Sequence, residues 1–257
     1  MKEKQLEQIQ KGIRCTNSYW SSKDTLSKLE KSNTLIDTQL SALLFIEKTS
    51  YSFWRLYFYI QDFTKINWTI FKEKALVAEI VVRHSKKEKW NPVLESFEQK
   101  GGFKIYDTFN RMFRDKQDVD VKGIDFSIIE MASDKDIVTI HHLLETNFDL
   151  YSGKIPSLEE LKNLTETTFL IKDKGQIVAF FITEKKGTTL EFRYWLVLEN
   201  YRGRKYGNTL MKRVLTFDPE IVRITSWISQ KNKNVILAHE HLGFKEDGLT
   251  NYILYRA

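Results

Sequence analysis

The chain has 257 residues, a length that allows one large domain or two of ordinary size. Hydrophobic residues make up 42% of it, aromatic residues 13%, and prolines number only 3, so the composition excludes a disordered or low-complexity protein. The net charge is +6: residues 1–120 carry 21 Lys and Arg against 16 Asp and Glu, and residues 121–257 carry 19 against 18. Because the basic residues alternate with acidic ones and form no stripe, the charge does not favour nucleic acid as a partner.

The N-terminal sequence and the cysteine count bear on location. The first ten residues are charged and lack the apolar core of a signal peptide, and no apolar run approaches the length of a membrane-spanning helix. The one cysteine, Cys15, excludes an intramolecular disulfide framework and is interpreted as an inert structural thiol. We therefore expect a cytoplasmic protein with no membrane partner.

The first half is predicted to begin with short polar helices and to continue as strands rich in aromatic and branched residues. The predicted elements are helices at 2–12 and 23–31, strands at 42–47, 53–60 and 75–82, a helix at 92–100 and a hairpin at 103–113. Ser22 or Asp24 is a candidate cap for the second helix, and the first two strands are predicted to form a hairpin. Gly101 and Gly102 are predicted to end the last helix.

A short charged segment at 114–123, poor in large apolar residues, is interpreted as an inter-domain linker. Beyond it the predicted elements are a strand at 125–131, a helix through 137–144, a helix at 158–164, strands at 168–172, 176–183 and 189–198, a helix at 207–216, a strand at 221–228, a helix at 232–241, and a hairpin at 244–256 about Gly248. The helix through 137–144 is predicted to be capped by Ser133 or Asp134.

A basic turn joins the strand at 189–198 to the helix at 207–216. The turn, Arg202–Gly207, contains three cations and two glycines. Backbone N–H groups at a helix N-terminus, with the positive end of the helix dipole behind them, favour phosphate oxygens, and glycines let a ligand approach the backbone. The turn is therefore a candidate anion site, although a solvated helix cap gives the same pattern.

Two motifs give residues 125–257 a family resemblance. Val197–Gly207 is similar to the cofactor loop of the GNAT superfamily of acyl-CoA-dependent N-acyltransferases, and Asn232–Phe244 resembles the later motif of that family that ends in Leu-Gly-Phe. The resemblance implies an α+β fold in which a mixed, mostly antiparallel sheet is flanked by helices. It also implies acetyl-CoA or another acyl-CoA as co-substrate, and no metal.

The resemblance further implies which residues hold the cofactor. Backbone groups near Leu196 and Val197 would pair with pantetheine, Asn232 would hold its amide, and N–H groups of the basic turn would bind the pyrophosphate. The expected cofactor residues are Leu196, Val197, Arg202, Gly203, Arg204, Lys205, Tyr206, Gly207, Asn208 and Asn232.

The sequence departs from the family pattern at two positions that matter for chemistry. Lys205 stands where the loop has its central glycine, and it either crowds the pyrophosphate or supplies a cation to it. His239 stands where many members have a tyrosine as general acid; it is a candidate proton donor, or a packing residue. Strand alternation is predicted to put one set of side chains on a single face: Glu191, Arg193, Trp195 and Val197. Glu191 is the candidate base on that face, or else it pairs with Arg193 or a lysine.

The first half resembles a degenerate copy of the second. In both, a helix is followed by Gly-Phe, and Asn91, Gly102 and Phe103 have the register of Asn232, Gly243 and Phe244. The only glycine before Lys100 is Gly12, so no glycine-punctuated cofactor loop is expected there. We therefore predict a degenerate GNAT-like domain at 1–120 and a GNAT acyltransferase domain at 121–257.

The predicted function is transfer of acetyl from acetyl-CoA to a primary amine of a small molecule or peptide, by a monomer or homodimer. The alternative is a catalytically silent acyl-CoA-binding sensor or interaction module, since both Lys205 and His239 depart from the family pattern.

Overall fold

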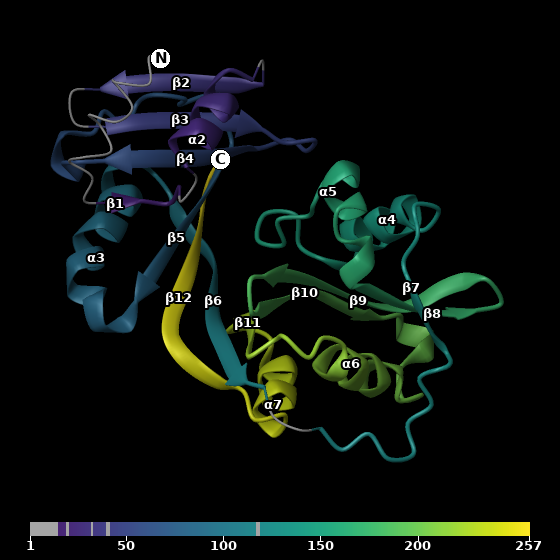
Figure 1. Cartoon of the computed structure of the whole chain (residues 1–257). Helices are drawn as coiled ribbons and strands as arrows, with labels where there is room; N and C mark the ends of the chain where they lie inside the picture. The colour runs from purple at the N-terminus through teal and green to yellow at the C-terminus, as the bar shows by residue number, and fades with distance from the viewer. Residues whose placement is uncertain (1–14, 19–20, 32, 40–41, 117–118) are drawn as a thin grey trace. The chain divides into compact units, whose positions relative to one another are not determined.

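The computed structural model describes residues 15–18, 21–31, 33–39, 42–116 and 119–257. The helix predicted at 2–12 lies outside the described residues. The chain divides into two compact units that do not follow chain order. Unit 1 consists of residues 1–110, 229–231 and 248–257, and unit 2 of residues 111–228 and 232–247. Two long strands, β6 (Lys104–Asp115) and β12 (Lys245–Arg256), therefore contribute residues to both units (Figure 1).

Unit 1 is a mixed sheet with helices on both faces. Its elements are β1 (Cys15–Thr16), α2 (Ser22–Leu29), β2 (Thr34–Gln39), β3 (Ala42–Lys48), β4 (Trp54–Ile60), β5 (Leu76–Arg83) and α3 (Lys87–Glu95), with a π-helical turn at Ser96–Lys100. The strand order is β2-β3-β4-β5-β12, antiparallel except between β4 and β5. The predicted hairpin of β3 and β4 is confirmed, with Ala42 opposite Ile60 and Lys48 opposite Trp54. The strand β2 was missed, and α2 is capped by Ser21, not by Ser22 or Asp24.

The parallel strands β4 and β5 pair only from Trp54–Leu76 to Leu56–Ala78, although β4 continues to Ile60. Because β3 occupies the other edge of β4 along its whole length, the edge that β5 leaves is taken by β1. Asn17 completes this filling: its side-chain Nδ2 donates to the Leu56 carbonyl at 2.9 Å, and its Oδ1 accepts from the Phe58 N–H at 2.9 Å. The gap between the diverging strands β4 and β5 is thus filled by β1 and Asn17 of the same chain.

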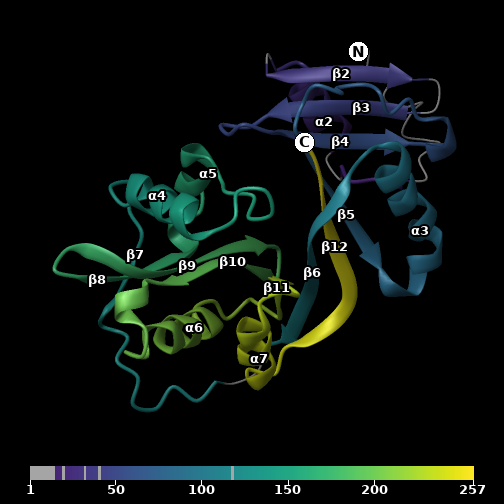
Figure 2. The same cartoon turned by 180° about the vertical axis from the view of Figure 1, so that it is seen from behind.

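Unit 2 places helices on both faces of its strands. Its elements are β7 (Ile129–Met131), α4 (Ile137–Asn147), α5 (Leu158–Lys162), β8 (Thr168–Asp173), β9 (Gln176–Lys186), β10 (Thr189–Val197), α6 (Tyr206–Thr216), β11 (Arg223–Ser229) and α7 (Lys233–His241). Strands β7 to β10 are antiparallel neighbours, and β11 is parallel to β10. Helices α4 and α5 lie on one face, and α6 and α7 on the other (Figure 1 and, from behind, Figure 2).

Each face of the unit 2 sheet has its own apolar core. The core under α4 and α5 is built around Ile140, Leu144, Phe180 and Leu196. The core under α6 and α7 includes the fully buried Phe181, Leu210 and Met211. Helix α6 begins and ends within one residue of its predicted bounds, because its apolar residues recur at helical spacing. The predicted fold class, a mostly antiparallel sheet flanked by helices, is confirmed.

Both predicted hairpins at the ends of the two halves are wrong. Residues 104–113 and 245–256 lie in the single strands β6 and β12. Gly248 has a φ of 77°, yet the chain continues as a strand, and Leu249–Arg256 pair with β5 from Arg83 to Leu76. The strand predicted at 125–131 is confined to Ile129–Met131, since Asp125 accepts the Ser127 N–H in a turn. The predicted linker at 114–123 begins too early, because Arg114 is buried at the end of β6.

The two long strands end in a matching arrangement. Arg114 in β6 lies over the Phe244 ring at 5.9 Å and donates to the Leu242 carbonyl at 2.6 Å. Arg256 in β12 lies over the Phe103 ring at 5.1 Å and donates to the Gly101 carbonyl at 3.2 Å. Phe103 and Phe244 each follow a helix and a glycine. Arg114 lies near the end of β6, the strand after Phe103, but it packs on Phe244. Arg256 ends β12, the strand after Phe244, but it packs on Phe103. The packing partner of each helix end is therefore supplied by the other half of the sequence.

No helix in the described part of the chain is long and apolar enough to cross a membrane.

Candidate functional site

Strand β10 leaves its parallel neighbour halfway along. The pairing of β10 with β11 runs from Thr189–Arg223 to Phe192–Ser226, while β10 itself continues to Val197. The other edge of β10 stays paired with β9 as far as Val197–Ala179. In the described part of unit 2, the edge of β10 that faces β11 therefore has no strand partner over its last residues, and its backbone groups are available there to a ligand.

A β-bulge in β10 changes which side chains share a face. The register with β9 shifts between Phe192 and Tyr194. Phe192, Trp195 and Val197 all pack on the side of α6 and α7, whereas Tyr194 belongs to the core under α4 and α5. Since alternation holds before the bulge, Glu191 faces α4 and α5. The prediction that Glu191 and Trp195 share a face is therefore wrong, because the extra residue inverts the alternation.

The basic turn leads from β10 into α6 through residues with unusual backbone angles. Gly203 has a φ of 81°, and Lys205, at the N-cap of α6, has a φ of 66°. The first backbone bond of the helix runs from the Thr209 N–H to the Lys205 carbonyl at 3.0 Å. Among the described residues, the backbone N–H groups from Gly203 to Asn208 have no hydrogen-bond acceptor in good geometry. The turn thus presents consecutive free donors at the positive end of a helix dipole.

Side chains of the turn are partly engaged with one another. The Arg204 guanidinium lies 4.7 Å from the centre of the Tyr201 ring, and Tyr201 stacks on Tyr206 with ring centres 6.4 Å apart. The Arg202 side chain reaches back to the Val197 carbonyl at 3.5 Å, the limit of a hydrogen bond. Lys205 is exposed. Its ammonium is therefore available to an anion, and its backbone takes the left-handed conformation that a glycine adopts without strain.

Gly207 is required by the indole of Trp195. A Cβ atom at position 207 would lie 2.9 Å from the Trp195 ring, closer than van der Waals contact permits. The ring is held from its other sides, since it stacks on Phe181 at 5.5 Å and contacts His239 at 6.3 Å between centres. The Trp195 ring therefore packs directly against Gly207 in the first turn of α6, a role that the sequence analysis did not assign to it. The pairing of a glycine with an indole becomes evident only once the bulge is known.

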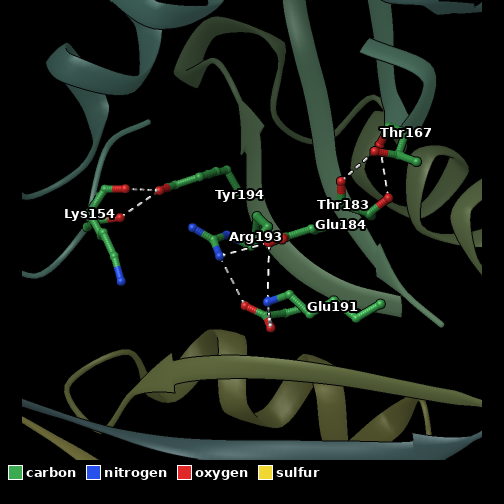
Figure 3. A network of polar contacts seen from close by, with 9 residues as sticks. Lys154, Thr167, Thr183, Glu184, Glu191, Arg193 and Tyr194 are labelled. Carbon is green, nitrogen blue, oxygen red and sulfur yellow. Dashed lines mark hydrogen bonds and ion pairs between the residues drawn. The ribbon is translucent and has the colours of Figure 1, made fainter. Parts of the chain in front are cut away.

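Glu191 is held in a compact network of four charges (Figure 3). Its carboxylate bonds the Lys186 ammonium at 2.9 Å and the Arg193 guanidinium at 3.3 Å. Both cations also pair with Glu184, which lies directly opposite Glu191 on β9. Burial alone would lower the pKa of Arg193, but the neighbouring Tyr194 and the two carboxylates outweigh it and raise that pKa above its ordinary value. The network contains two cations and two carboxylates, and its arginine stays positively charged.

His239 lies in the apolar core under α6 and α7. It is 3% exposed and packs edge-on against Phe244 at 4.9 Å between ring centres. Its Nδ1 lies 2.9 Å from the Val235 carbonyl, whereas its Nε2 is buried with no hydrogen-bond partner in the described structure. Burial lowers the pKa of His239 below 6.5. The imidazole is therefore neutral near pH 7, with its proton on the nitrogen that faces the carbonyl.

Asn232 forms the N-cap of α7, where its side-chain oxygen accepts the Val235 N–H at 3.3 Å. The predicted cofactor residues from Leu196 to Asn208 form one continuous path along the end of β10, through the turn and into α6. Over the described residues, no cluster of three or more His, Cys, Asp or Glu side chains has a metal-binding arrangement.

The sequence and the fold were compared with known proteins. Residues 137–244 match the model of the acetyltransferase (GNAT) family. They form a GNAT domain. A search of curated proteins found no match to the sequence. Enzymes of this family use an acyl-CoA as co-substrate and take amine acceptors, so the match supports an acyl-CoA-dependent N-acyltransferase in general terms.

Solved structures extend the likeness beyond the GNAT domain. A tandem GNAT protein from the clavulanic acid biosynthesis pathway has a TM-score of 0.58 at 13% identity, covering 93% of this chain and 88% of that one. A GCN5-related N-acetyltransferase from Sphaerobacter thermophilus has a TM-score of 0.57 at 14% identity, covering 93% and 86%. A GNAT-family acetyltransferase from Colwellia psychrerythraea has a TM-score of 0.55 at 12% identity, covering 99% and 96%. At these identities the likeness concerns the fold.

The GNAT domain contains the whole candidate site. Its bounds include the diverging end of β10, the basic turn, α6, and the helix α7 that carries His239. The geometry places Glu191 on the face of α4 and α5, and His239 on the face of α6 and α7. The two predicted catalytic side chains therefore lie on opposite faces of β10.

Proposed function

We propose that the GNAT domain transfers an acyl group, most simply acetyl, from acyl-CoA to a primary amine. The observation that carries this proposal is the way β10 leaves β11 and then continues into a turn with free N–H groups. A thioester cofactor requires both parts: an unpaired strand edge for its extended amide-bearing arm, and a cluster of donors for its pyrophosphate. Both occur consecutively in one stretch of chain.

The residues present fit such a cofactor. The N–H groups of Gly203, Arg204, Lys205, Tyr206, Gly207 and Asn208 would bind the pyrophosphate, and exposed Arg202 and Lys205 would add charge. Backbone groups at Leu196 and Val197 would hold the arm, and Asn232 would add an amide contact. When bound, the cofactor supplies an activated acyl group. The task of the protein is to orient it and to take the proton from the attacking amine.

Glu191 is the residue we assign to proton removal. It is 17% exposed and projects from the strand that runs into the cofactor turn. Arg193 and Lys186 hold its carboxylate in place, so it would act as a base only after one of these bonds gives way to an amine. His239 is less well placed to return a proton, because its Nε2 carries no hydrogen while Nδ1 donates to Val235.

A second candidate is a catalytically silent acyl-CoA sensor. It is favoured by one observation, the engagement of both predicted catalytic side chains: two cations hold Glu191, and the apolar core seals His239. The two candidates share the cofactor site and differ in whether the acyl group leaves it.

We further propose that residues 1–120 are a degenerate GNAT-like domain. Three features of unit 1 support this: a parallel strand pair that diverges after three residue pairs, a helix followed by Gly-Phe and a long strand, and an arginine packed on that phenylalanine. In unit 1 the divergence is filled by β1 and Asn17. We therefore assign one cofactor site to each chain. A cytoplasmic location and a monomeric or homodimeric state stay predictions.

The test combines binding with turnover. Acetyl-CoA is expected to raise the melting temperature, and free thiol is expected to appear when a panel of primary amines is added. A thermal shift without thiol release with any amine would favour the sensor, and the absence of a shift with every acyl-CoA tried would contradict both candidates. Gly207→Glu places a carboxylate among the phosphate-binding N–H groups and an oversized side chain against Trp195, so it should abolish binding.

The role of Glu191 has a matched control on the neighbouring strand. Glu191→Gln is expected to lower the acyl-transfer rate at least tenfold while leaving acyl-CoA affinity unchanged, since a general base contributes roughly 100-fold or more. Glu184→Gln removes the opposite carboxylate from the same network and is expected to retain most of the rate. Equal rates for both variants would remove Glu191 as the base.

A further inference from the structure

The loop between α4 and α5 is tied to β10 by one buried hydroxyl. The Tyr194 hydroxyl lies 2.7 Å from the carbonyl of Gly153 and 2.7 Å from that of Lys154, some 40 residues away in sequence (Figure 3). Tyr194 is 5% exposed, and its ring packs edge-on against Phe148 at the end of α4, with ring centres 5.3 Å apart. The β-bulge in β10 is what turns Tyr194 toward this loop.

The loop takes up a backbone shape that needs an external partner. Lys154 has a φ of 49°, a left-handed conformation unfavourable for a lysine. Gly153 has no room for a side chain, because a Cβ would overlap the Asp149 carbonyl oxygen. The bonds within the loop, from Ser152 and Gly153 back to Asp149, leave the carbonyls of Gly153 and Lys154 pointing at the Tyr194 hydroxyl. That hydroxyl is therefore the group that holds the loop in its strained shape.

The same tyrosine adjoins the network that holds Glu191. Its neighbour in sequence, Arg193, lies 5.9 Å from the centre of the Tyr194 ring and bonds the Glu191 carboxylate at 3.3 Å. Glu191 and Tyr194 project from the same face of β10, toward α4 and α5. A short series of contacts thus leads from the loop carbonyls through Tyr194 and Arg193 to Glu191 (Figure 3).

We propose that Tyr194 is a positioning residue that fixes the loop at 149–155 against the face of β10 from which Glu191 projects, and so determines which amines reach Glu191. The catalytic meaning of this assignment rests on the proposed acyl transfer. The hydrogen bonding that holds the loop to the strand does not depend on that function, because it involves only the Tyr194 hydroxyl and the two loop carbonyls. Tyr194 acts through the loop and takes no part in bond making.

Limited trypsin digestion tests the tie without any activity. Cleavage after Lys154 requires the loop to open, and loss of one hydrogen bond is expected to make cleavage of Tyr194→Phe about three- to tenfold faster than that of the wild type. Tyr59→Phe is the matched control, because Tyr59 is also buried and its hydroxyl bonds Thr25 at 2.9 Å, in unit 1. Cleavage after Lys154 should be unchanged in that variant. Equal cleavage rates for Tyr194→Phe and wild type would overturn the proposal.

Two further measurements separate positioning from general loosening. Hydrogen exchange in Tyr194→Phe should accelerate in peptides that cover 149–155 and stay unchanged in α6; acceleration throughout unit 2 would overturn the proposal. With acetyl-CoA and the most active amine of the panel, KM for the amine should rise several-fold at unchanged kcat and acetyl-CoA affinity. An unchanged KM would overturn the positioning role. If the wild type releases no thiol with any amine, the proposed function fails while the digestion and exchange results stand.

Discussion

At Lys205 the effect of backbone strain on stability can be separated from the effect of the side-chain charge on cofactor binding. It is exposed, and it holds a φ of 66° at the N-cap of α6. Two substitutions divide its roles: Lys205→Ala removes the ammonium and keeps the Cβ that is strained in this conformation, whereas Lys205→Gly removes both. The left-handed conformation costs a residue with a Cβ about 1–2 kcal/mol. Glycine avoids that cost but loses about 0.5–1 kcal/mol more conformational entropy on folding.

These magnitudes predict different stabilities for the two variants. Lys205→Gly should be more stable than Lys205→Ala by about 0.5–1 kcal/mol, measured by urea unfolding, and Lys205→Ala should match the wild type. For cofactor affinity, an exposed cation beside a phosphate contributes about 0.2–1 kcal/mol, so both variants should bind CoA roughly 1.4- to 5-fold more weakly, with a smaller deficit at high salt.

Titration calorimetry with CoA at two salt concentrations provides the binding measurement. Tighter binding by Lys205→Gly than by the wild type would refute the view that Lys205 aids the pyrophosphate, and would show that its Cβ crowds the site. Equal stability of Lys205→Gly and Lys205→Ala would refute the assignment of strain to this residue, whatever the binding result.

Three other substitutions probe the packing around the site and in unit 1. Burial lowers the pKa of His239 below its ordinary 6.5, so the unfolded chain binds more protons than the folded one. The free energy of unfolding, measured with urea, should therefore fall as the pH drops from 7.5 through 6.5 to 5.5. His239→Gln should make that fall smaller, whereas the control His241→Gln, at an exposed position, should leave it unchanged. Arg256→Ala leaves four carbonyls without their guanidinium donor and should destabilise the protein by about 2–4 kcal/mol, with exposed Lys104→Ala as a neutral control in the same measurement. Asn17→Ala should cost about 1–3 kcal/mol through two lost bonds to β4, and a thermal midpoint equal to that of the wild type would contradict the filling of the unit 1 divergence by Asn17.

Local patterns in the sequence were sufficient for the elements around the cofactor turn. The apolar residues Leu210, Met211 and Val214 recur at helical spacing, and the preceding glycines and cations mark a helix start, so α6 and its basic turn could be predicted together. The same holds for the hairpin of β3 and β4, where two apolar runs are separated by a short polar segment. In these cases the determining contacts are close in sequence.

Patterns failed where the outcome depends on a contact that the local pattern does not record. The β-bulge at Arg193 depends on pairing with β9 and leaves no mark in the alternation of β10, so the face of Glu191 was predicted wrongly relative to Trp195. Gly248 has the positive φ of a turn residue, yet the residues after it pair with β5, some 170 positions earlier, and continue as a strand. The environment of His239 depends likewise on the rings of Phe192 in β10 and of Phe244, which precedes β12.

The matching ends of β6 and β12 make the stability of unit 1 depend on residues that come late in the sequence. Phe103 lies in the first half of the sequence, but the arginine that covers it is Arg256, more than 150 positions later. Deletion of residues 249–256 would therefore weaken unit 1, whereas in unit 2 Phe244 would stay covered by Arg114. During synthesis, unit 1 likewise lacks the segment that pairs with β5 until residues 249–256 have been made.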